Sequence, residues 1–91
     1  MQKSFKYKIT NGKLIEVKVI FDDVIRNVEI LGDFFIYPSE GLVELERCII
    51  GLTFDEKIIV RLLEKTVSDK KIELIGIDPQ SIAYAVCQAI R

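Results

Sequence analysis

The 91-residue chain holds few side chains that could carry out acid–base or nucleophilic chemistry, because it contains no histidine. Histidine is the side chain whose ordinary pKa lies nearest neutrality, and it is the commonest metal ligand in proteins. Nucleophile pairs of the Ser–His and Cys–His kinds therefore cannot form within this chain. Two isolated cysteines, Cys48 and Cys87, do not supply a zinc site either. We expect the chain alone to be non-catalytic and to bind no metal or cofactor itself.

Both cysteines fall in apolar stripes of predicted helices. A buried free thiol behaves there as a small hydrophobic group, and a disulfide between Cys48 and Cys87 is not expected in a reducing cytosol. A thiol enzyme built on either residue is the least favoured alternative, because neither stripe contains a base that could activate a thiolate. If an activity of this protein were insensitive to thiol alkylation, the thiol-enzyme alternative would be excluded.

The acidic residues are predicted to serve the structure. Asp22-Asp23 separates two apolar segments, and aspartate is favoured in turns because its side chain bonds to the nearby backbone. Glu44 and Glu46 lie two positions apart on a predicted helix, so their carboxylates diverge and form no acid–base pair. Gly32-Asp33 holds a single glycine, which is too little for a phosphate-binding loop.

Charge and hydropathy argue against nucleic acid and membrane as partners. The 13 Lys and Arg residues nearly balance the 14 Asp and Glu residues, and the net charge is −1. Lys6, Lys8 and Lys18 are expected on the exposed face of a sheet, without the interleaved aromatic residues of a nucleic-acid surface. The first residues form no apolar signal segment, and no apolar run is long enough to span a bilayer. A cytoplasmic protein is expected.

An aromatic segment, Asp33-Phe34-Phe35-Ile36-Tyr37, is the best candidate for a contact surface. Consecutive residues of an extended chain point to opposite sides, so Phe34 and Phe35 cannot both point inward. One of the two is expected to fill the core, and the other is expected to lie outside with Tyr37. Exposed aromatic residues clustered on a small domain are typical of a surface that binds a partner.

These residues must be positioned by a sheet and helices, and the first third of the sequence predicts three antiparallel strands. Phe5, Tyr7 and Ile9 alternate with lysines, which is the pattern of a half-buried strand. Asn11-Gly12 is a strong hairpin signal, because both residues tolerate a positive φ. Two further strands are predicted over 14–21 and 25–31, and Gly32 is expected to make the turn that ends the third strand.

Helical periodicity replaces the alternating pattern after Pro38. A first helix is predicted over 42–50 and is expected to end with Gly51 at the C′ position. Residues 53–56 read as a capping box with Thr53 as the N-cap of a second helix that runs to about Thr66, before a polar turn over 68–71. A short strand over 72–75 is expected at the edge of the meander. Asp78 is predicted to cap a last helix.

The predicted order is β-β-β-α-α-β-α. It indicates one α+β domain in which three helices cover one face of an antiparallel sheet, made of a three-stranded meander and a short later strand.

Several short motifs follow one another in the chain. Residues 30–35 end in Gly-Asp-Phe-Phe, the next helix ends in Ile-Gly-Leu at 50–52, and residues 76–82 read Gly-Ile-Asp-Pro-Gln-Ser-Ile. With the opening strand at 13–17, these motifs resemble the C-terminal domain of lipoate–protein ligases in order and spacing. The resemblance covers nearly the whole chain, so residues 1–91 are expected to form one such domain. The large catalytic domain that precedes it in many members is missing, which looks like the split, archaeal form of the enzyme.

The resemblance implies a division of labour between two subunits. In that family the catalytic subunit binds lipoate, ATP and Mg, forms lipoyl-AMP, and transfers the lipoyl group to a lipoyl domain or to glycine-cleavage H protein. This chain would be the accessory subunit of the heterodimer, needed for adenylation without donating its chemistry. Asp33, Phe34, Phe35 and Tyr37 would face or brace the catalytic subunit. An alternative of another class is a self-associating ligand-binding or regulatory module whose exposed aromatic residues form its own dimer interface.

Overall fold

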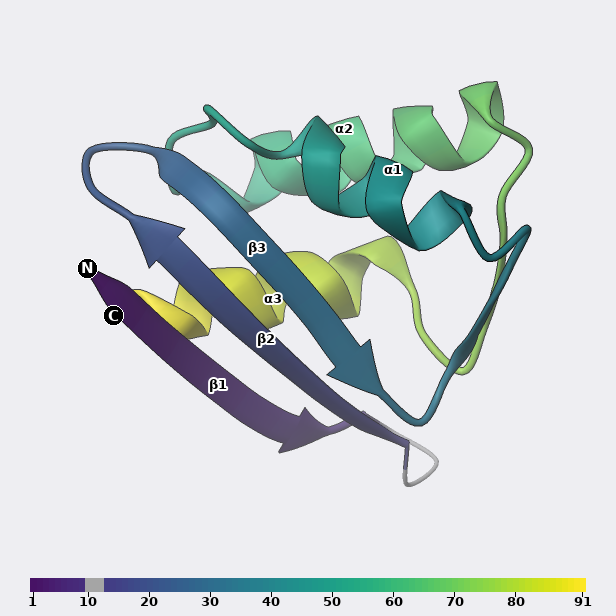
Figure 1. Cartoon of the computed structure of the whole chain (residues 1–91), viewed down its shortest axis with the longest axis horizontal. Coiled ribbons are helices and arrows are strands. Elements are labelled where there is room, and N and C mark those ends of the chain that lie inside the picture. Colours follow the sequence, from purple (N-terminus) through teal and green to yellow (C-terminus); the bar gives the residue numbers. More distant parts are fainter. Residues whose placement is uncertain (10–12) are drawn as a thin grey trace.

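The computed structural model describes residues 1–9 and 13–91, and the predicted turn that contains Gly12 lies outside these residues. The elements follow one another as β1 (Gln2–Lys8), β2 (Leu14–Phe21), β3 (Ile25–Gly32), β4 (Phe35–Tyr37), α1 (Gly41–Cys48), α2 (Glu56–Asp69), β5 (Glu73–Ile75) and α3 (Pro79–Ala89) (Figure 1). The fold class is α+β, as the sequence predicts, with three helices and antiparallel strands.

The three-stranded sheet has the order β1-β2-β3, and both pairs of strands are antiparallel. The period-two pattern of β2 places Ile15, Val17 and Val19 on the inner face, where all three are fully buried. Val28 and Ile30 of β3 lie on the same face and are also buried. The opposite face carries charged residues, among which Lys18 faces Glu29 across the β2–β3 pair.

The predicted later strand is shorter than expected and does not join the edge of this sheet. β5 pairs with β4 in a separate two-stranded antiparallel sheet, so the predicted placement beside the meander is wrong. Other groups already bond to the free edge of β3: the carboxylate of Glu46 accepts from the Ile30 N–H at 2.8 Å. β4 was not predicted, because a strand of three residues is too short to establish a period.

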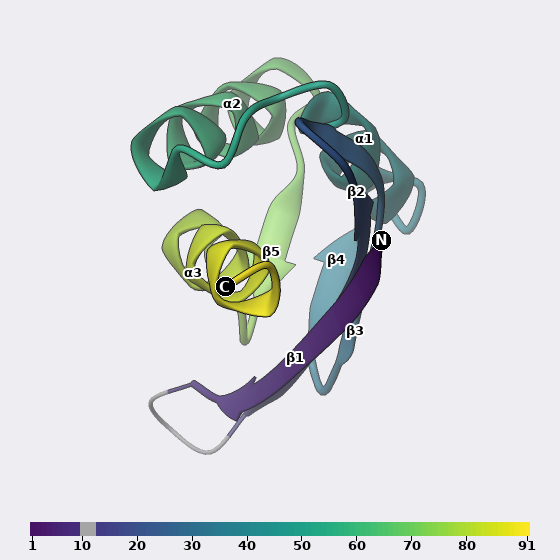
Figure 2. The ribbon, with the colours of Figure 1, turned by 90° about the vertical axis from the view of Figure 1, so that its left-hand side faces the viewer.

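α2 and α3 lie on the concave side of the three-stranded sheet (Figure 2). α3 packs across β1 and β2, and α1 packs beside β3. α2 packs mainly on α1 and α3, where it buries Ile59 and Leu63. One cluster of buried apolar residues therefore joins the sheet to all three helices. Within the described residues, no helix is both long and apolar enough to cross a membrane.

The second helix begins two residues later than the capping box predicts. Its N-cap is Asp55, whose carboxylate accepts from the N–H groups of Lys57 at 3.0 Å and Ile58 at 3.3 Å. The prediction of Thr53 as the cap is therefore wrong. Aspartate is as good an N-cap as threonine, and Asp55 has the extended backbone that the position needs. The last turn of α2 also includes Ser68 and Asp69, which the sequence assigned to a turn.

The other two helix ends show where the remaining structural residues lie. Asp78 is the N-cap of α3, and its carboxylate accepts from the Ser81 N–H at 2.6 Å. α1 ends at Cys48 with Ile49 as its C-cap. Gly51 was expected at the C′ position, but it lies one residue beyond C′. Gly51 has a φ of +89°, and its N–H donates to the Ile25 carbonyl at 2.7 Å. The glycine therefore turns the chain back along β3.

Candidate interaction surface

The candidate surface begins where the chain leaves the three-stranded sheet. Gly32, the last residue of β3, has a φ of +152°, and a Cβ there would overlap the carbonyl oxygen of Leu14. The next residue, Asp33, is exposed and donates its N–H to the same carbonyl at 2.9 Å. Only glycine fits this close approach. The chain then separates from β2 and is free to pair elsewhere as β4.

The two phenylalanines after Asp33 point to opposite sides, as the extended chain predicts. Phe34 is half-buried and packs against the core. Phe35 and Tyr37 lie outside, with 60% and 53% of their surface exposed. Their rings stack at a centroid distance of 6.5 Å and an interplanar angle of 13°. Two aromatic side chains are therefore presented to solvent together.

β5 adds an aliphatic residue to the aromatic pair. Phe35 lies opposite Ile75, and Tyr37 lies opposite Glu73, so these side chains share the outer face of the two-stranded sheet. Ile75 is 44% exposed. We call Phe35, Tyr37 and Ile75 the β4–β5 surface. The sequence analysis missed Ile75, because only the pairing of β4 with β5 brings it beside Phe35.

α1 holds the two-stranded sheet in place from inside. Ile36 and Leu74 form the inner pair of that sheet and pack against the core. Gly41, the first residue of α1, is buried against Ile36 and Ile72: a Cβ there would lie 3.0 Å from the Ile72 side chain and 3.2 Å from that of Ile36. The missing side chain lets the helix approach closely. The exposed rings of Phe35 and Tyr37 therefore lie on a strand that α1 supports.

Metal-binding and thiol chemistry find little support among the described residues. The described residues include no cluster of three side chains that could hold a metal ion. Burial raises the pKa of the Cys48 and Cys87 thiols, which disfavours the reactive thiolate. The Cys48 Sγ donates to the Leu45 carbonyl at 3.2 Å, as a structural thiol does. These surroundings count against the thiol-enzyme alternative.

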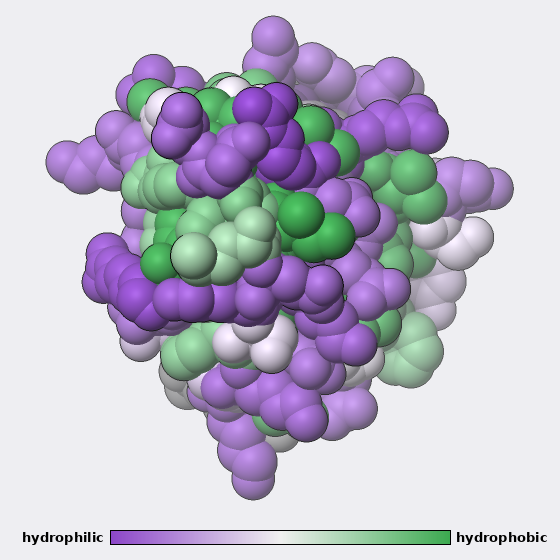
Figure 3. Space-filling model, turned by 60° about the vertical axis from the view of Figure 1, so that its left-hand side comes forward, coloured by the Kyte–Doolittle hydropathy of each residue, from purple (hydrophilic) through white to green (hydrophobic). Residues whose placement is uncertain are grey.

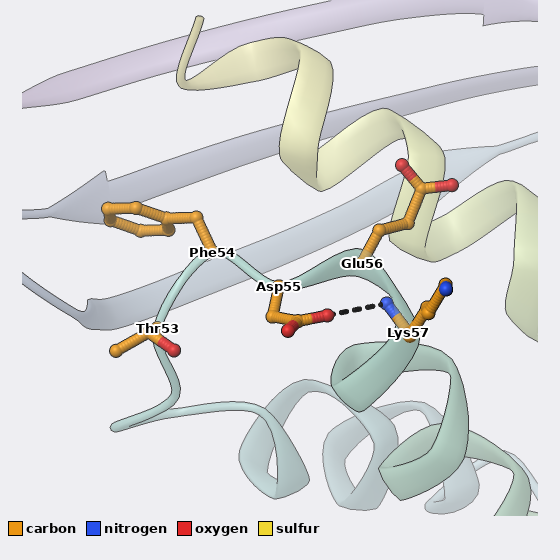
Figure 4. A pocket seen from close by; sticks show the side chains of 5 residues that line it. All are labelled: Thr53, Phe54, Asp55, Glu56 and Lys57. Carbon is orange, nitrogen blue, oxygen red and sulfur yellow. Dashed lines mark hydrogen bonds between the residues drawn. The ribbon is translucent and has the colours of Figure 1, made fainter.

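A hollow of about 660 Å³ opens at the start of α2 and is lined by residues 53–57 (Figure 4). Helix N-termini often bind anions through free N–H groups. Here the Asp55 carboxylate already accepts from the N–H of Lys57 (Figure 4). It also accepts from the N–H of Ile58. A negative group of the protein itself thus occupies the place an anion would take. The hollow supplies no independent reason to expect a ligand.

The face shown in Figure 3 carries another apolar area. Hydrophobic atoms gather in the middle of this face and are bordered by hydrophilic ones. Among the aromatic residues near the start of α2, Phe54 packs edge to face on Phe21 at a centroid distance of 5.5 Å. Both are half-buried members of the core cluster. Phe35 and Tyr37, by contrast, are mostly exposed, so the β4–β5 surface is the stronger candidate for a partner contact.

Comparison with known proteins gives a match among solved structures. No family profile matches the chain, and a search of curated proteins finds no match either. A similar solved structure comes from the structural analysis of an archaeal lipoylation system, a bi-partite lipoate protein ligase and its E2 lipoyl domain from Thermoplasma acidophilum. The TM-score is 0.76 over 94% of each chain, and the identity is 23%. At this identity the likeness establishes a shared fold.

Proposed function

We propose that this chain is a non-catalytic accessory subunit of a lipoate–protein ligase, required with a larger catalytic subunit for ATP-dependent formation of lipoyl-AMP. The observation that carries the proposal is the fold shared with a chain of a lipoylation system that includes a bi-partite ligase. The alignment covers the same large share of both chains, so the two chains are of similar length. The ordered sequence motifs at 30–35, 50–52 and 76–82 support the same assignment independently.

The side-chain chemistry is consistent with this division of labour. With no histidine and with the thiolate disfavoured at both cysteines, the chain offers no imidazole base and no activated thiol nucleophile near neutral pH. In the proposal, the catalytic subunit binds lipoate, ATP and Mg, and this chain contributes surface. Lipoyl domains or glycine-cleavage H protein would be indirect partners, through the catalytic subunit.

The β4–β5 surface is the proposed contact with the catalytic subunit. Aromatic residues are enriched in protein interfaces, and a few of them supply most of the binding free energy. Phe35 and Tyr37 are exposed, already stacked and fixed on a sheet, so little conformational entropy would be lost on binding. Asp33 is exposed just before β4. Phe34 packs on the core beneath β4 and so supports the strand from inside.

The decisive experiment measures lipoate-dependent AMP formation by the catalytic subunit of the same organism, with and without this chain. We expect adenylation only when both proteins are present, no activity from this chain alone, and co-elution of the two on size exclusion. Equal adenylation without this chain, together with separate elution, would contradict the proposal.

Two further outcomes of the same experiment separate the remaining possibilities. A stable homodimer that does not bind the catalytic subunit would support the self-associating module instead. Lipoylation of this chain itself, detected as a mass increase, would make it an acceptor, which is the other kind of component named for the similar structure.

A further inference from the structure

The two edges of the three-stranded sheet differ in what covers them. Along β3, the Ile25 N–H donates to the Leu52 carbonyl at 2.9 Å, and the Ile25 carbonyl accepts from Gly51. Further along, the Ile30 N–H donates to Glu46. The link between α1 and α2, together with one side chain of α1, thus occupies much of the β3 edge. β1 lies at the margin of the molecule (Figure 1), and among residues 1–9 and 13–91 it pairs only with β2.

The register shows which groups of β1 face away from the sheet. Met1 and Phe21 exchange backbone bonds at 2.9 and 3.0 Å, and the Ile9 N–H donates to the Lys13 carbonyl at 2.7 Å. In an antiparallel ladder such bonded pairs alternate with non-bonded pairs. Odd-numbered residues of β1 therefore bond to β2. Gln2, Ser4, Lys6 and Lys8 direct their N–H and C=O groups towards the open edge.

The charges of the side chains along this edge favour an acidic partner. β1 carries Lys3, Lys6 and Lys8 and no acidic residue. Lysines on an edge strand oppose pairing with a second copy, because the like charges would meet. The same lysines attract a strand that carries carboxylates.

The inner face beside the edge is aromatic. Tyr84 of α3 lies 5.2 Å from Tyr7 and 6.1 Å from Phe5 between ring centroids, and it is 39% exposed. The Tyr7 hydroxyl donates to the Ser81 carbonyl at 3.1 Å, which ties β1 to α3. A strand added to β1 would place every second side chain on this aromatic cluster.

We propose that the edge of β1 binds an extended strand of a partner protein, one that alternates acidic residues with apolar residues. Its backbone would bond to the N–H and C=O groups of Ser4 and Lys6. Its apolar side chains would pack on Phe5, Tyr7 and Tyr84, and its carboxylates would lie near Lys6 and Lys8 on the outer face. This surface is separate from the β4–β5 surface, and the proposal stands without the lipoylation role.

The test uses the full chain and a nine-residue peptide of alternating valine and glutamate with both ends blocked. Amide hydrogen exchange, followed by NMR, reports on each backbone N–H. We expect the peptide to slow exchange at Ser4 and Lys6 at least tenfold, with little change at Phe5, whose N–H already bonds to β2. Added salt should weaken the binding. A peptide of alternating valine and lysine is the matched control and should not bind.

Two variants make the test specific. Ser4→Pro removes an outward N–H without breaking a bond to β2, and proline is tolerated on edge strands. We expect it to weaken peptide binding at least tenfold, whereas Ser4→Ala should bind as the parent chain does. Retained protection at Phe5 and Tyr7 shows that the variant is folded. Lys8→Glu leaves every backbone group in place and should weaken binding of the acidic peptide.

Three outcomes would overturn the proposal. The first is equal binding of the acidic and basic peptides. The second is slowed exchange at sites other than Ser4 and Lys6, with Ser4→Pro binding normally. The third is a dimer of this chain that Ser4→Pro dissociates, since the edge would then bind a second copy.

Discussion

The two sheets of this protein distribute apolar residues in opposite ways. The three-stranded sheet buries Ile15, Val17 and Val19 completely, and its outer face mixes charged residues with the partly exposed Ile20 and Leu31. The two-stranded sheet has strands of three residues, half-buries Ile36 and Leu74, and exposes Phe35 and Tyr37. Both are antiparallel and both pack against the same core. The two sheets therefore differ in the length of their strands and in the exposure of their apolar side chains.

The difference indicates that folding and recognition use different parts of the chain. A long strand with one buried face gains enough free energy from its own alternating pattern to hold its register. A strand of three residues gains little by itself and depends on the elements around it. The side chains on its outer face do not pack in the core, so they can be exposed aromatic residues that contact a partner.

The largest expected effect is on stability, and it compares one core residue of each sheet. Ile15→Ala removes a fully buried side chain from the central strand and should lower the free energy of unfolding by about 4 kcal/mol. Ile36→Ala removes a half-buried side chain and should cost about 1.5 kcal/mol. Urea unfolding of both variants measures the two values. Equal losses would mean that the two-stranded sheet carries as much of the stability as the three-stranded sheet.

The next effect concerns the junction between the sheets. Gly32→Ala places a Cβ against the Leu14 carbonyl and should cost about 3 kcal/mol. Gly51→Ala is the matched control: its φ is also positive, but no atom lies within 4 Å of the added Cβ. It should cost about 1 kcal/mol. Melting temperatures of the two variants rank the losses, and the reverse order would show that the approach to Leu14 relaxes easily.

A smaller effect on binding tests the outer face of the two-stranded sheet. Phe35→Ala should change the stability by less than about 0.5 kcal/mol, because the side chain is mostly exposed. Under the proposed function, the same change should weaken association with the catalytic subunit by about 2 kcal/mol, or about thirtyfold. Phe34→Ala is the control, because Phe34 packs inward and its loss should lower the melting temperature. Calorimetric titration that finds Phe35→Ala binding unchanged would remove this surface from the interface.

The smallest effect concerns the edge of β3. Burial raises the pKa of the Glu46 carboxyl, the bond from the Ile30 N–H opposes the rise, and Glu29 adds to it. A carboxyl whose pKa is higher in the folded state stabilises the protein most when protonated, and this contribution is lost as pH rises through the folded value. The stability of the parent chain relative to Glu46→Gln should therefore fall as pH rises above the ordinary glutamate pKa of about 4.3.

Glu46→Ala is the companion variant for the same edge. It leaves the Ile30 N–H without its acceptor and should cost about 1 kcal/mol at every pH, whereas Glu46→Gln retains an acceptor oxygen. Denaturant unfolding across this pH range measures both variants. A parent chain that gains stability relative to Glu46→Gln as pH rises would contradict the direction of the pKa shift.

Much of the fold could be predicted from the sequence because the pattern is local. The alternation in residues 14–21 and 25–31 fixes which side chains of the three-stranded sheet are buried, since neighbouring positions of a strand must face opposite ways. Asp78-Pro79 marks the start of α3, because the cap and the fixed φ of proline act on adjacent residues. Opposite directions for Phe34 and Phe35 follow from the same rule.

The start of α2 shows why a local rule can still fail. Thr53 and Asp55 are both good N-cap residues, and the sequence offers a capping box for the first of them. Phe54 lies between them and packs edge to face on Phe21 of β2. This contact joins residues far apart in the sequence, and Asp55 is the residue that caps the helix. The local pattern does not include that contact.

The sequence by itself determined the class of fold, the inner face of the three-stranded sheet and the absence of histidine, because each depends on residue types and short-range periodicity. Only the tertiary structure decided that β5 pairs with β4 and that Ile75 joins Phe35 and Tyr37. It also decided that the β3 edge is covered, whereas no described strand covers the edge of β1. Short strands carry too little pattern to choose a partner, so their pairing is set by the helix and the core against which they pack.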